Sequence, residues 1–207
     1  MERFVIAITR TCGSGGTTIG KMLSNDLKIN MYDRELLHLA SEDSGISESL
    51  FVSADEHVKS SLLYMASKKV YEGELIPPES NDFTSNDNLF NYQAKILREL
   101  AEKESYVVIG RCADHILKDN PNVFKIFIHA SDEYCIKHEM ETLCISEKEA
   151  IKQIKKLDKY RRGYYYYHTG NEWENVKNYD LSLDTSKLGI EKCVKYIKEY
   201  IKLRMNS

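Results

Sequence analysis

The fold of this chain is decided by Arg3-Phe4-Val5-Ile6-Ala7-Ile8-Thr9-Arg10 and the turn that follows, Thr11-Cys12-Gly13-Ser14-Gly15-Gly16-Thr17-Thr18. The first part is a short apolar run rich in Val and Ile, which is typical of a buried parallel strand. The second part holds three glycines and ends in a pair of threonines. Apolar residues then recur at helical spacing at Ile19, Met22, Leu23 and Leu27. The stretch therefore predicts a strand, a Gly-rich turn and a helix in succession.

A glycine loop between a strand and a helix can bind anions, because backbone N–H groups and the helix dipole converge there. Against the phosphate-loop pattern G-x-x-x-x-G-K-[ST], Gly16 takes the second glycine and Thr18 the hydroxyl that reaches Mg²⁺. Thr11 then stands at the first glycine and Thr17 at the lysine. The loop has the backbone of a nucleotide site without its usual cation. The alternative interpretation is a glycine turn that merely joins strand to helix.

The bulk properties favour one globular α/β domain over residues 1–207. A net charge of -3 gives no reason to expect a nucleic-acid or membrane-surface partner, and no apolar run approaches membrane-spanning length. Because a strand is expected directly at the start of the chain, no signal peptide is predicted. Its five cysteines form no C-x-x-C pair, which fits a reduced compartment better than a disulfide framework or a zinc site. We therefore expect a cytoplasmic protein.

The remaining chain alternates helices with short apolar strands. Strands are expected at 29–32, 106–109, 123–128 and 179–184, and helices at 33–43, 47–72, 89–103, 131–141, 146–165 and 189–204. Asp33 is predicted to cap the helix that follows it, and residues 77–88 are predicted to form a mobile loop. This alternation implies a parallel sheet with right-handed crossovers, in which ligands bind at the carboxyl ends of the strands.

The positions just after the predicted strands hold a consistent set of polar residues. Arg10 ends the first strand, Tyr32, Asp33 and Arg34 follow the second, and Gly110, Arg111 and Asp114 follow the third. Arginine suits phosphate recognition because its guanidinium is planar, permanently charged and able to form two parallel hydrogen bonds. Three arginines beside an anion-binding turn therefore predict a site for a phosphorylated ligand.

Taken together, these segments resemble the cytidylate kinase-like family of P-loop kinases over nearly the whole chain. The resemblance is carried by Thr9-Arg10 through Gly16, Tyr32-Asp33-Arg34-Glu35-Leu36-Leu37, Val108 to Asp114, Asp158-Lys159-Tyr160-Arg161, Trp173, Tyr179-Asp180-Leu181 and Asp184-Thr185. It implies a three-layer α/β/α P-loop NTPase fold with a five-stranded parallel sheet in the order 2-3-1-4-5. It also implies an acceptor-side helical insertion at about 33–104 and a helical lid at about 158–178.

The resemblance implies transfer of the γ-phosphoryl group of ATP, with Mg²⁺, to a nucleoside monophosphate or a related small phosphorylated acceptor. By position, the donor phosphates meet Gly13, Ser14, Gly15, Gly16, Thr17 and Thr18, and Thr18 reaches the metal. The acceptor meets Tyr32, Asp33, Arg34, Arg111, Asp114, Asp158 and Arg161, with the acid of the Asp158/Arg161 pair at the sugar and the arginine at the phosphate. The catalytic set is Arg10, Thr18, Arg161 and Arg162, of which the last two begin the lid.

Plainer interpretations stay open for several of these residues. Arg34 and Arg111 could be surface or ion-pair residues, and Asp158 with Arg162 could form a solvated pair along one helix. The run from Tyr164 to Tyr167, with Trp173, could stack on a base or pack beneath a lid. His129, His138 and His168 have no metal-ligand spacing.

Three departures from the family pattern bear on catalysis. Thr17 replaces a cationic residue, Ile109 precedes Gly110 where related kinases carry an acid, and Tyr134, Cys135 and His138 replace arginines. A cation at the loop can be worth several kcal/mol of barrier, and Arg10 is hypothesised to supply it from the opposite side.

Three functions therefore stay under consideration: a small-molecule kinase, a nucleotide-binding regulatory module of the same fold without turnover, and a purely structural α/β protein. The sequence does not determine the acceptor's base, its sugar or the oligomeric state.

Overall fold

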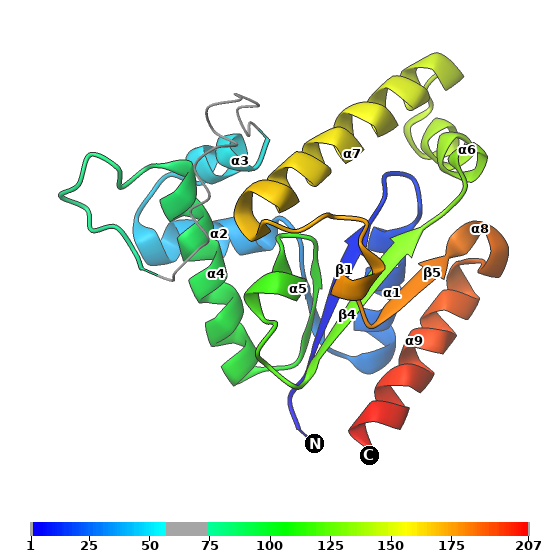
Figure 1. The fold of residues 1–207 in the computed structure, drawn as a ribbon, viewed down its shortest axis with the longest axis horizontal. Helices are drawn as coiled ribbons and strands as arrows, with labels where there is room; N and C mark the ends of the chain where they lie inside the picture. The colour runs from blue at the N-terminus through cyan, green and yellow to red at the C-terminus, as the bar shows by residue number, and fades with distance from the viewer. Residues whose placement is uncertain (1, 57–73, 207) are drawn as a thin grey trace.

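Five strands form one parallel sheet in the order β2-β3-β1-β4-β5 in the computed structural model, which describes residues 2–56 and 74–206 (Figure 1). The central strand β1 (Val5–Arg10) pairs with β3 (Tyr106–Ile109) and β4 (Val123–His129). The edge strands are β2 (Asn30–Tyr32) beside β3 and β5 (Leu181–Asp184) beside β4. The predicted strand order 2-3-1-4-5 is confirmed.

Helices cover both faces of this sheet, which gives the predicted three-layer α/β/α arrangement. One face carries α1 (Gly16–Leu27) and α9 (Ile190–Met205), and the other carries α2 (Glu35–Ser44), α4 (Asn86–Lys103) and α5 (Ala113–Ile116). Outside these layers lie α3 (Glu48–Glu56), α6 (Asp132–Leu143), α7 (Glu147–Thr169), the 3-10 turn Val176–Asn178 and α8 (Thr185–Leu188). In Figure 1 the long helix α7 crosses above the carboxyl ends of the strands.

The alternation of side chains along β1 divides the core in two. Ile6 and Ile8 pack in the cluster that includes residues of α1 and α9, whereas Val5 and Ala7 pack in the cluster of α2, α4 and α5. Successive side chains of a strand point to opposite faces, so a strand covered on both faces must be apolar throughout. This explains why β1 reads as a continuous apolar run.

The start of α2 differs from the prediction. The N-cap residue is Arg34, with helical backbone angles and no side-chain capping hydrogen bond, so the prediction that Asp33 caps the helix was wrong. The Glu35 side chain instead reaches back and accepts a hydrogen bond from the Asp33 N–H at 3.2 Å. The Asp33 side chain is thereby left to line the cavity described below.

The segment before α4 is shorter than predicted, because α4 begins at Asn86 with Ser85 as its N-cap. The loop predicted at 77–88 therefore ends before its expected boundary. Asn88, which is fully buried, connects this loop to the helix: its side chain accepts from the Ile76 N–H at 2.8 Å and donates to the Phe83 carbonyl at 2.7 Å. Of the helix predicted at 47–72, Glu48–Glu56 is helical and the part beyond residue 56 lies outside the described residues.

Helix α7 is longer than predicted and runs to Thr169, where Gly170 ends it with φ +70°. It begins in a capping box formed by Ser146 and Glu149, which satisfies N–H groups of the first turn. Residues 158–169 of the predicted lid are thus the second half of one continuous helix. In the described part of the chain, no helix has both the length and the apolar character needed to span a bilayer.

Candidate active site

The glycine loop, residues 11–18, joins β1 to α1 in a conformation that requires its glycines. Gly13 and Gly15 have φ of +77° and +80°, in the left-handed region that other residues rarely adopt. A methyl group at Gly13 would lie 2.6 Å from the carbonyl oxygen of Cys135 in α6, and one at Gly15 would lie 3.0 Å from Ile190 at the start of α9. The loop is therefore enclosed by α6 and α9, and residues 12–16 are buried.

Side-chain hydrogen bonds hold the same loop in shape. The fully buried Ser14 hydroxyl donates to the Thr11 carbonyl at 2.8 Å, and the Ser14 carbonyl accepts from the Thr185 hydroxyl at 2.8 Å. The first N–H groups of α1 have no acceptors within the helix and carry the positive end of its dipole. Thr17 is half-buried there and Thr18 is exposed. The arrangement suits an anion at the start of α1.

Beside the glycine loop lies a cavity of about 610 Å³, here called the arginine cavity. Of the described residues, those that line it are Thr9, Arg10, Asp33, Arg34, Ile109, Gly110, Arg111, Cys112, Lys156, Leu157, Tyr160, Arg161, Tyr164, Tyr165 and Trp173. They come from the ends of β1 and β3, from the start of α2, and from α7 and the segment after it. The volume lies in the range of small-molecule sites, roughly 300–1,000 Å³. Its cationic side chains outnumber the single carboxylate, so it suits an anionic ligand.

Arg10 lies between the glycine loop and this cavity, in space left by two glycines. A methyl group at Gly16 would lie 2.5 Å from the Arg10 Cβ, and one at Gly110 would lie 2.5 Å from the Arg10 Nη1. The stem of the side chain therefore passes over Gly16, and its guanidinium lies against Gly110. Both contacts place a permanent positive charge where the loop and the cavity meet.

Arg111 is held in the cavity by an unusual turn after β3. Gly110, Arg111 and Cys112 have φ of +72°, +60° and +53° in succession. For a residue with a side chain, the left-handed region costs roughly 1–2 kcal/mol. Strain of this kind concentrates at functional sites, and here its result is that the Arg111 side chain lines the cavity.

Asp158 and Arg161 connect α7 to the glycine loop. Asp158 Oδ1 accepts hydrogen bonds from the Cys12 N–H at 2.9 Å and from Arg161 Nη1 at 3.1 Å, and Arg161 Nη1 also lies 3.4 Å from the Arg10 carbonyl oxygen. Burial raises the pKa of Asp158, while the charge of Arg161 opposes that shift. Burial also raises the pKa of the Cys12 thiol to about 12, so this thiol stays protonated.

Besides Asp158 and the loop residues 13–18, the predicted site residues that do not line the arginine cavity are Asp114, Tyr32 and Arg162. Asp114 is buried, with Oδ2 accepting from the Tyr165 hydroxyl at 2.6 Å, and burial raises its pKa to about 6. The Tyr32 hydroxyl donates to Glu104 at 2.5 Å. Arg162 pairs with Glu174 at 2.8 Å on the surface, beside the Trp173 ring. The solvated pair between Asp158 and Arg162 that the sequence left open is therefore replaced by two other pairs.

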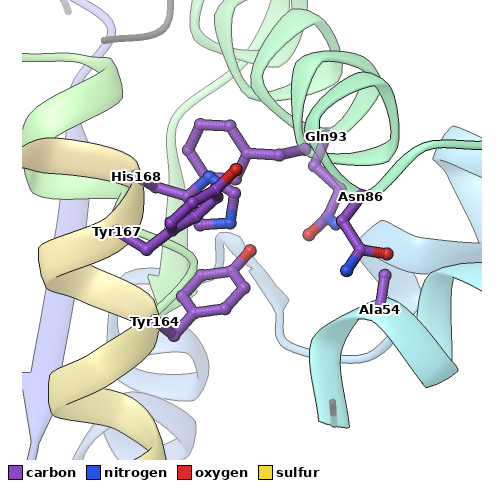
Figure 2. Close-up of a pocket in the computed structure, with 7 residues that line it drawn as sticks. Ala54, Asn86, Gln93, Tyr164, Tyr167 and His168 are labelled. Carbon is purple, nitrogen blue, oxygen red and sulfur yellow. The ribbon is translucent and has the colours of Figure 1, made fainter. Parts of the chain in front are cut away.

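The aromatic wall of the cavity consists of Tyr160, Tyr164, Tyr165 and Trp173. Tyr164, Tyr165 and Trp173 are also buried in the core, so they both pack and face the cavity. Behind Tyr164 lies a recess of about 10 Å³. Figure 2 shows Asn86 and Gln93 of α4 and Tyr167 and His168 of α7 around it.

His168 supports this wall from behind. Its ring stacks on Phe90 at 3.8 Å with an interplanar angle of 8°, and Tyr164 meets it edge-on at 4.5 Å. Burial lowers the pKa of His168 to about 3, so the ring is neutral and serves packing. The Tyr164 ring of the wall is therefore packed against a buried, neutral ring pair.

Sequence reasoning missed Lys156, Leu157 and Tyr160, which line the cavity. Helical periodicity could have revealed them, because each lies four residues before another residue of the same face of α7. Lys156 precedes Tyr160, Leu157 precedes Arg161, and Tyr160 precedes Tyr164. Extending the face of α7 that carries Arg161 backward by one turn leads to Lys156 and Leu157.

Residues 5–187 match the model of the cytidylate kinase-like family, a span that runs from β1 into α8. The chain belongs to the cytidylate kinase-like family. The resemblance inferred from the sequence is thereby confirmed. A cytidylate kinase of Fervidobacterium nodosum is 26% identical over 229 residues, covering 96% of this chain and 96% of that protein.

Solved structures extend the comparison for this member of the cytidylate kinase-like family. An uncharacterized protein from Eubacterium ventriosum is similar with a TM-score of 0.72 and 28% identity, over 97% of this chain and 99% of that one. The shikimate kinase of Bacteroides thetaiotaomicron has a TM-score of 0.53 at 16% identity, with 96% of this chain and 98% of that one covered. At that identity the likeness concerns the fold, and it confirms the predicted P-loop kinase architecture.

Proposed function

We propose that this protein transfers the γ-phosphoryl group of ATP to a nucleoside monophosphate, cytidylate or a close analogue, or to a related small phosphorylated acceptor. The observation that carries the proposal is the arginine cavity, in which Arg10, Arg34, Arg111 and Arg161 surround a space of about 610 Å³ next to the glycine loop. The name of the Fervidobacterium nodosum relative supports a cytidylate-like acceptor.

On the acceptor side, Arg34, Arg111 and Arg161 bind the acceptor's phosphate in this proposal, with Asp33 beside them. Their planar forks suit phosphate oxygens, and each such charge-assisted hydrogen bond is shorter and stronger than a neutral one. Asp114 supports the acceptor site from behind, because it accepts the hydrogen bond of the Tyr165 hydroxyl; Tyr32, whose hydroxyl donates to Glu104, has no role in this proposal. The aromatic wall gives the base a flat apolar surface on which to stack.

On the donor side, the backbone N–H groups of Gly13, Ser14, Gly15, Gly16, Thr17 and Thr18 bind the phosphates of ATP. The exposed hydroxyl of Thr18, at the start of α1, fits the role of a Mg²⁺ ligand, because Mg²⁺ takes few protein ligands beside substrate oxygens and water. When bound, Mg²⁺ would neutralise charge on the donor phosphates.

Arg10 compensates for the missing loop lysine in this mechanism. Its guanidinium lies against Gly110 and its stem against Gly16, so it can meet charge that develops between donor and acceptor phosphates. Charges held in place before reaction are a large contribution to phosphoryl transfer. Arg161 and Arg162 add positive charge from α7. The Arg162–Glu174 pair is exposed and worth at most about 1 kcal/mol, so its release costs little.

The test is a coupled assay with ATP, Mg²⁺ and CMP, dCMP, UMP and other monophosphates as acceptors. We expect turnover with at least one, strongly reduced in Arg10→Met. Absence of turnover on every monophosphate, from protein whose melting temperature rises with ATP, would instead support the second candidate function.

That second function is a nucleotide-binding regulatory module, favoured by Thr17 at the position of the loop lysine. Under it, ATP or CMP binds without transfer, and Thr17→Lys gains activity if the other parts are competent. If no nucleotide raises the melting temperature, both functions fail and a structural role is favoured.

A further inference from the structure

We propose that Asp158 is a positioning residue that connects the glycine loop to Arg161, and that it does not bind the acceptor's sugar. The inference rests on the proposed phosphoryl transfer and changes the role that the family pattern gives this acid. The central observation is that one oxygen, Asp158 Oδ1, accepts hydrogen bonds from both the glycine loop and Arg161.

The two donors come from distant parts of the chain. The Cys12 N–H belongs to the glycine loop, 146 residues away in sequence, and lies 2.9 Å from Asp158 Oδ1. Arg161 Nη1, one turn further along α7, lies 3.1 Å from the same oxygen. Cys12 is buried, so its N–H needs an acceptor within the protein. The carboxylate therefore fixes the backbone of the loop and the direction of Arg161 together.

The orientation of Asp158 separates it from its neighbours on α7. Lys156, Leu157, Tyr160 and Arg161 line the arginine cavity, whereas Asp158 is absent from the described residues that do. Its side chain is 16% exposed and directed to the loop. An acid that met an acceptor's sugar would have to face the cavity that the acceptor occupies.

Charge explains why an acid is tolerated so near a phosphate site. A carboxylate close to the loop would repel donor phosphates unless a cation neutralised it, and Arg161 does so at 3.1 Å. The pairing also limits Arg161 to the rotamers in which it reaches both Asp158 and the Arg10 carbonyl. Removing the carboxylate would release both the loop and the arginine.

The two roles predict different kinetics. A sugar ligand affects only the acceptor, so its loss lowers kcat/KM for the acceptor and leaves the KM for ATP unchanged. A positioning residue affects donor and acceptor together, whatever the sugar. Misplacement of reacting groups by about 1 Å can cost on the order of a hundredfold in rate.

The experiment compares wild type, Asp158→Ala and Asp158→Asn with CMP and dCMP as acceptors, and measures KM for ATP. We expect Asp158→Ala to lower kcat/KM by roughly 10- to 100-fold, equally for both acceptors, and to raise the KM for ATP. Asp158→Asn keeps an oxygen for the Cys12 N–H and should recover the KM for ATP more than the KM for the acceptor. Because dCMP keeps the 3′-hydroxyl, the KM for ATP decides: a loss of kcat/KM for CMP, for dCMP or for both, with the KM for ATP unchanged, would overturn the proposal. Glu147→Gln, an exposed acid at the start of α7, is the matched control and should leave all values unchanged.

A measurement without turnover separates this proposal from the proposed function. Hydrogen exchange of the Cys12 amide should be faster in Asp158→Ala than in wild type, and close to wild type in Asp158→Asn. This holds even if no monophosphate is phosphorylated. Unchanged exchange at Cys12 in Asp158→Ala would overturn the role of Asp158, whatever the activity. If Asp158→Ala does not fold, Asp158→Leu, which fills the space without offering an acceptor to the Cys12 N–H, takes its place, and unchanged exchange at Cys12 in that variant would overturn the proposal.

Discussion

The glycine loop and the arginine cavity lie side by side but offer different groups to a ligand. Residues 12–16 of the loop are buried and enclosed by α6 and α9, and the loop offers backbone N–H groups. The cavity is open and offers long charged side chains from β1, β3, α2 and α7. A ligand of the loop is therefore recognised by backbone shape, and a ligand of the cavity by charge. Substitutions should accordingly damage the loop through sterics and the cavity through lost ion pairs.

The largest expected effect is a steric one at the loop. In Gly13→Ala the new methyl group would lie 2.6 Å from the Cys135 carbonyl oxygen, on a residue with φ of +77°. We expect a loss of roughly 2–4 kcal/mol in the free energy of unfolding, and loss of ATP binding. Chemical denaturation and ATP titration would measure both.

The control for this change is Gly163→Ala in α7, where a methyl group would meet nothing within 4 Å. Replacing an exposed helical glycine by alanine should raise the free energy of unfolding by up to about 1 kcal/mol. Equal losses in the two variants would contradict the steric account of the loop.

The next effect is electrostatic and concerns Asp114 behind the cavity. Burial raises its pKa from 3.8 to about 6, so the folded protein binds this proton more tightly than the unfolded chain. The free energy of unfolding should therefore fall as pH rises from about 4 to about 6, by roughly 3 kcal/mol, and this component should stay constant above that range.

Asp114→Asn, which cannot ionise, should lose that component. The free energy of unfolding of the variant minus that of wild type should therefore be larger at pH 7 than at pH 4. Urea unfolding across pH 4–7 would measure the difference. Parallel curves for the two proteins would show that the carboxyl is not the group responsible.

Within the cavity, Arg34→Met keeps the length of the side chain and removes its charge. We expect kcat/KM for the monophosphate acceptor to fall by roughly 10- to 100-fold, since a hydrogen bond to a charged group is worth about 1.5–3 kcal/mol. The KM for ATP should change little, because the loop is untouched. Arg3→Met, at an exposed position before β1, is the control. An equal rise in both KM values would mean that loop and cavity do not act separately.

The smallest effect is a gain in stability at Arg111. In Arg111→Gly the residue no longer carries a side chain at φ +60°, so the free energy of unfolding should rise by up to about 1 kcal/mol. Acceptor binding should weaken at the same time. Thermal unfolding would measure the gain in stability, and acceptor kinetics would measure the weaker binding. A variant of lower stability would contradict the assignment of strain to this turn.

The same contrast explains how much could be predicted from sequence. The glycine loop follows from a local pattern, because Gly13, Gly15 and Gly16 stand directly between an apolar strand and an amphipathic helix, whereas the strand order was implied by the resemblance to the family. Arg34 and Arg111 could be placed at one rim because parallel strands end at the same edge. These inferences need only the chain order and the fold.

Other features depend on tertiary packing. That Asp158 turns to the Cys12 N–H while Arg161 faces the cavity depends on how α7 crosses the sheet, and Asp114 is withdrawn by a hydrogen bond to Tyr165, 51 residues away. Likewise, Glu35 replaces Asp33 in the local hydrogen bonding before α2. No local pattern in the sequence distinguishes these outcomes from their alternatives.

The central claim is that the arginine cavity selects a phosphorylated acceptor for transfer from ATP. It is tested most directly by initial rates of phosphoryl transfer to CMP and to cytidine, which differ only by the phosphate. We predict that kcat/KM for CMP, or for the monophosphate that reacts best, exceeds that of its nucleoside by at least about a hundredfold, because three arginines lose their ligand without the phosphate. Equal values for nucleotide and nucleoside, or transfer to no monophosphate at all, would contradict the account.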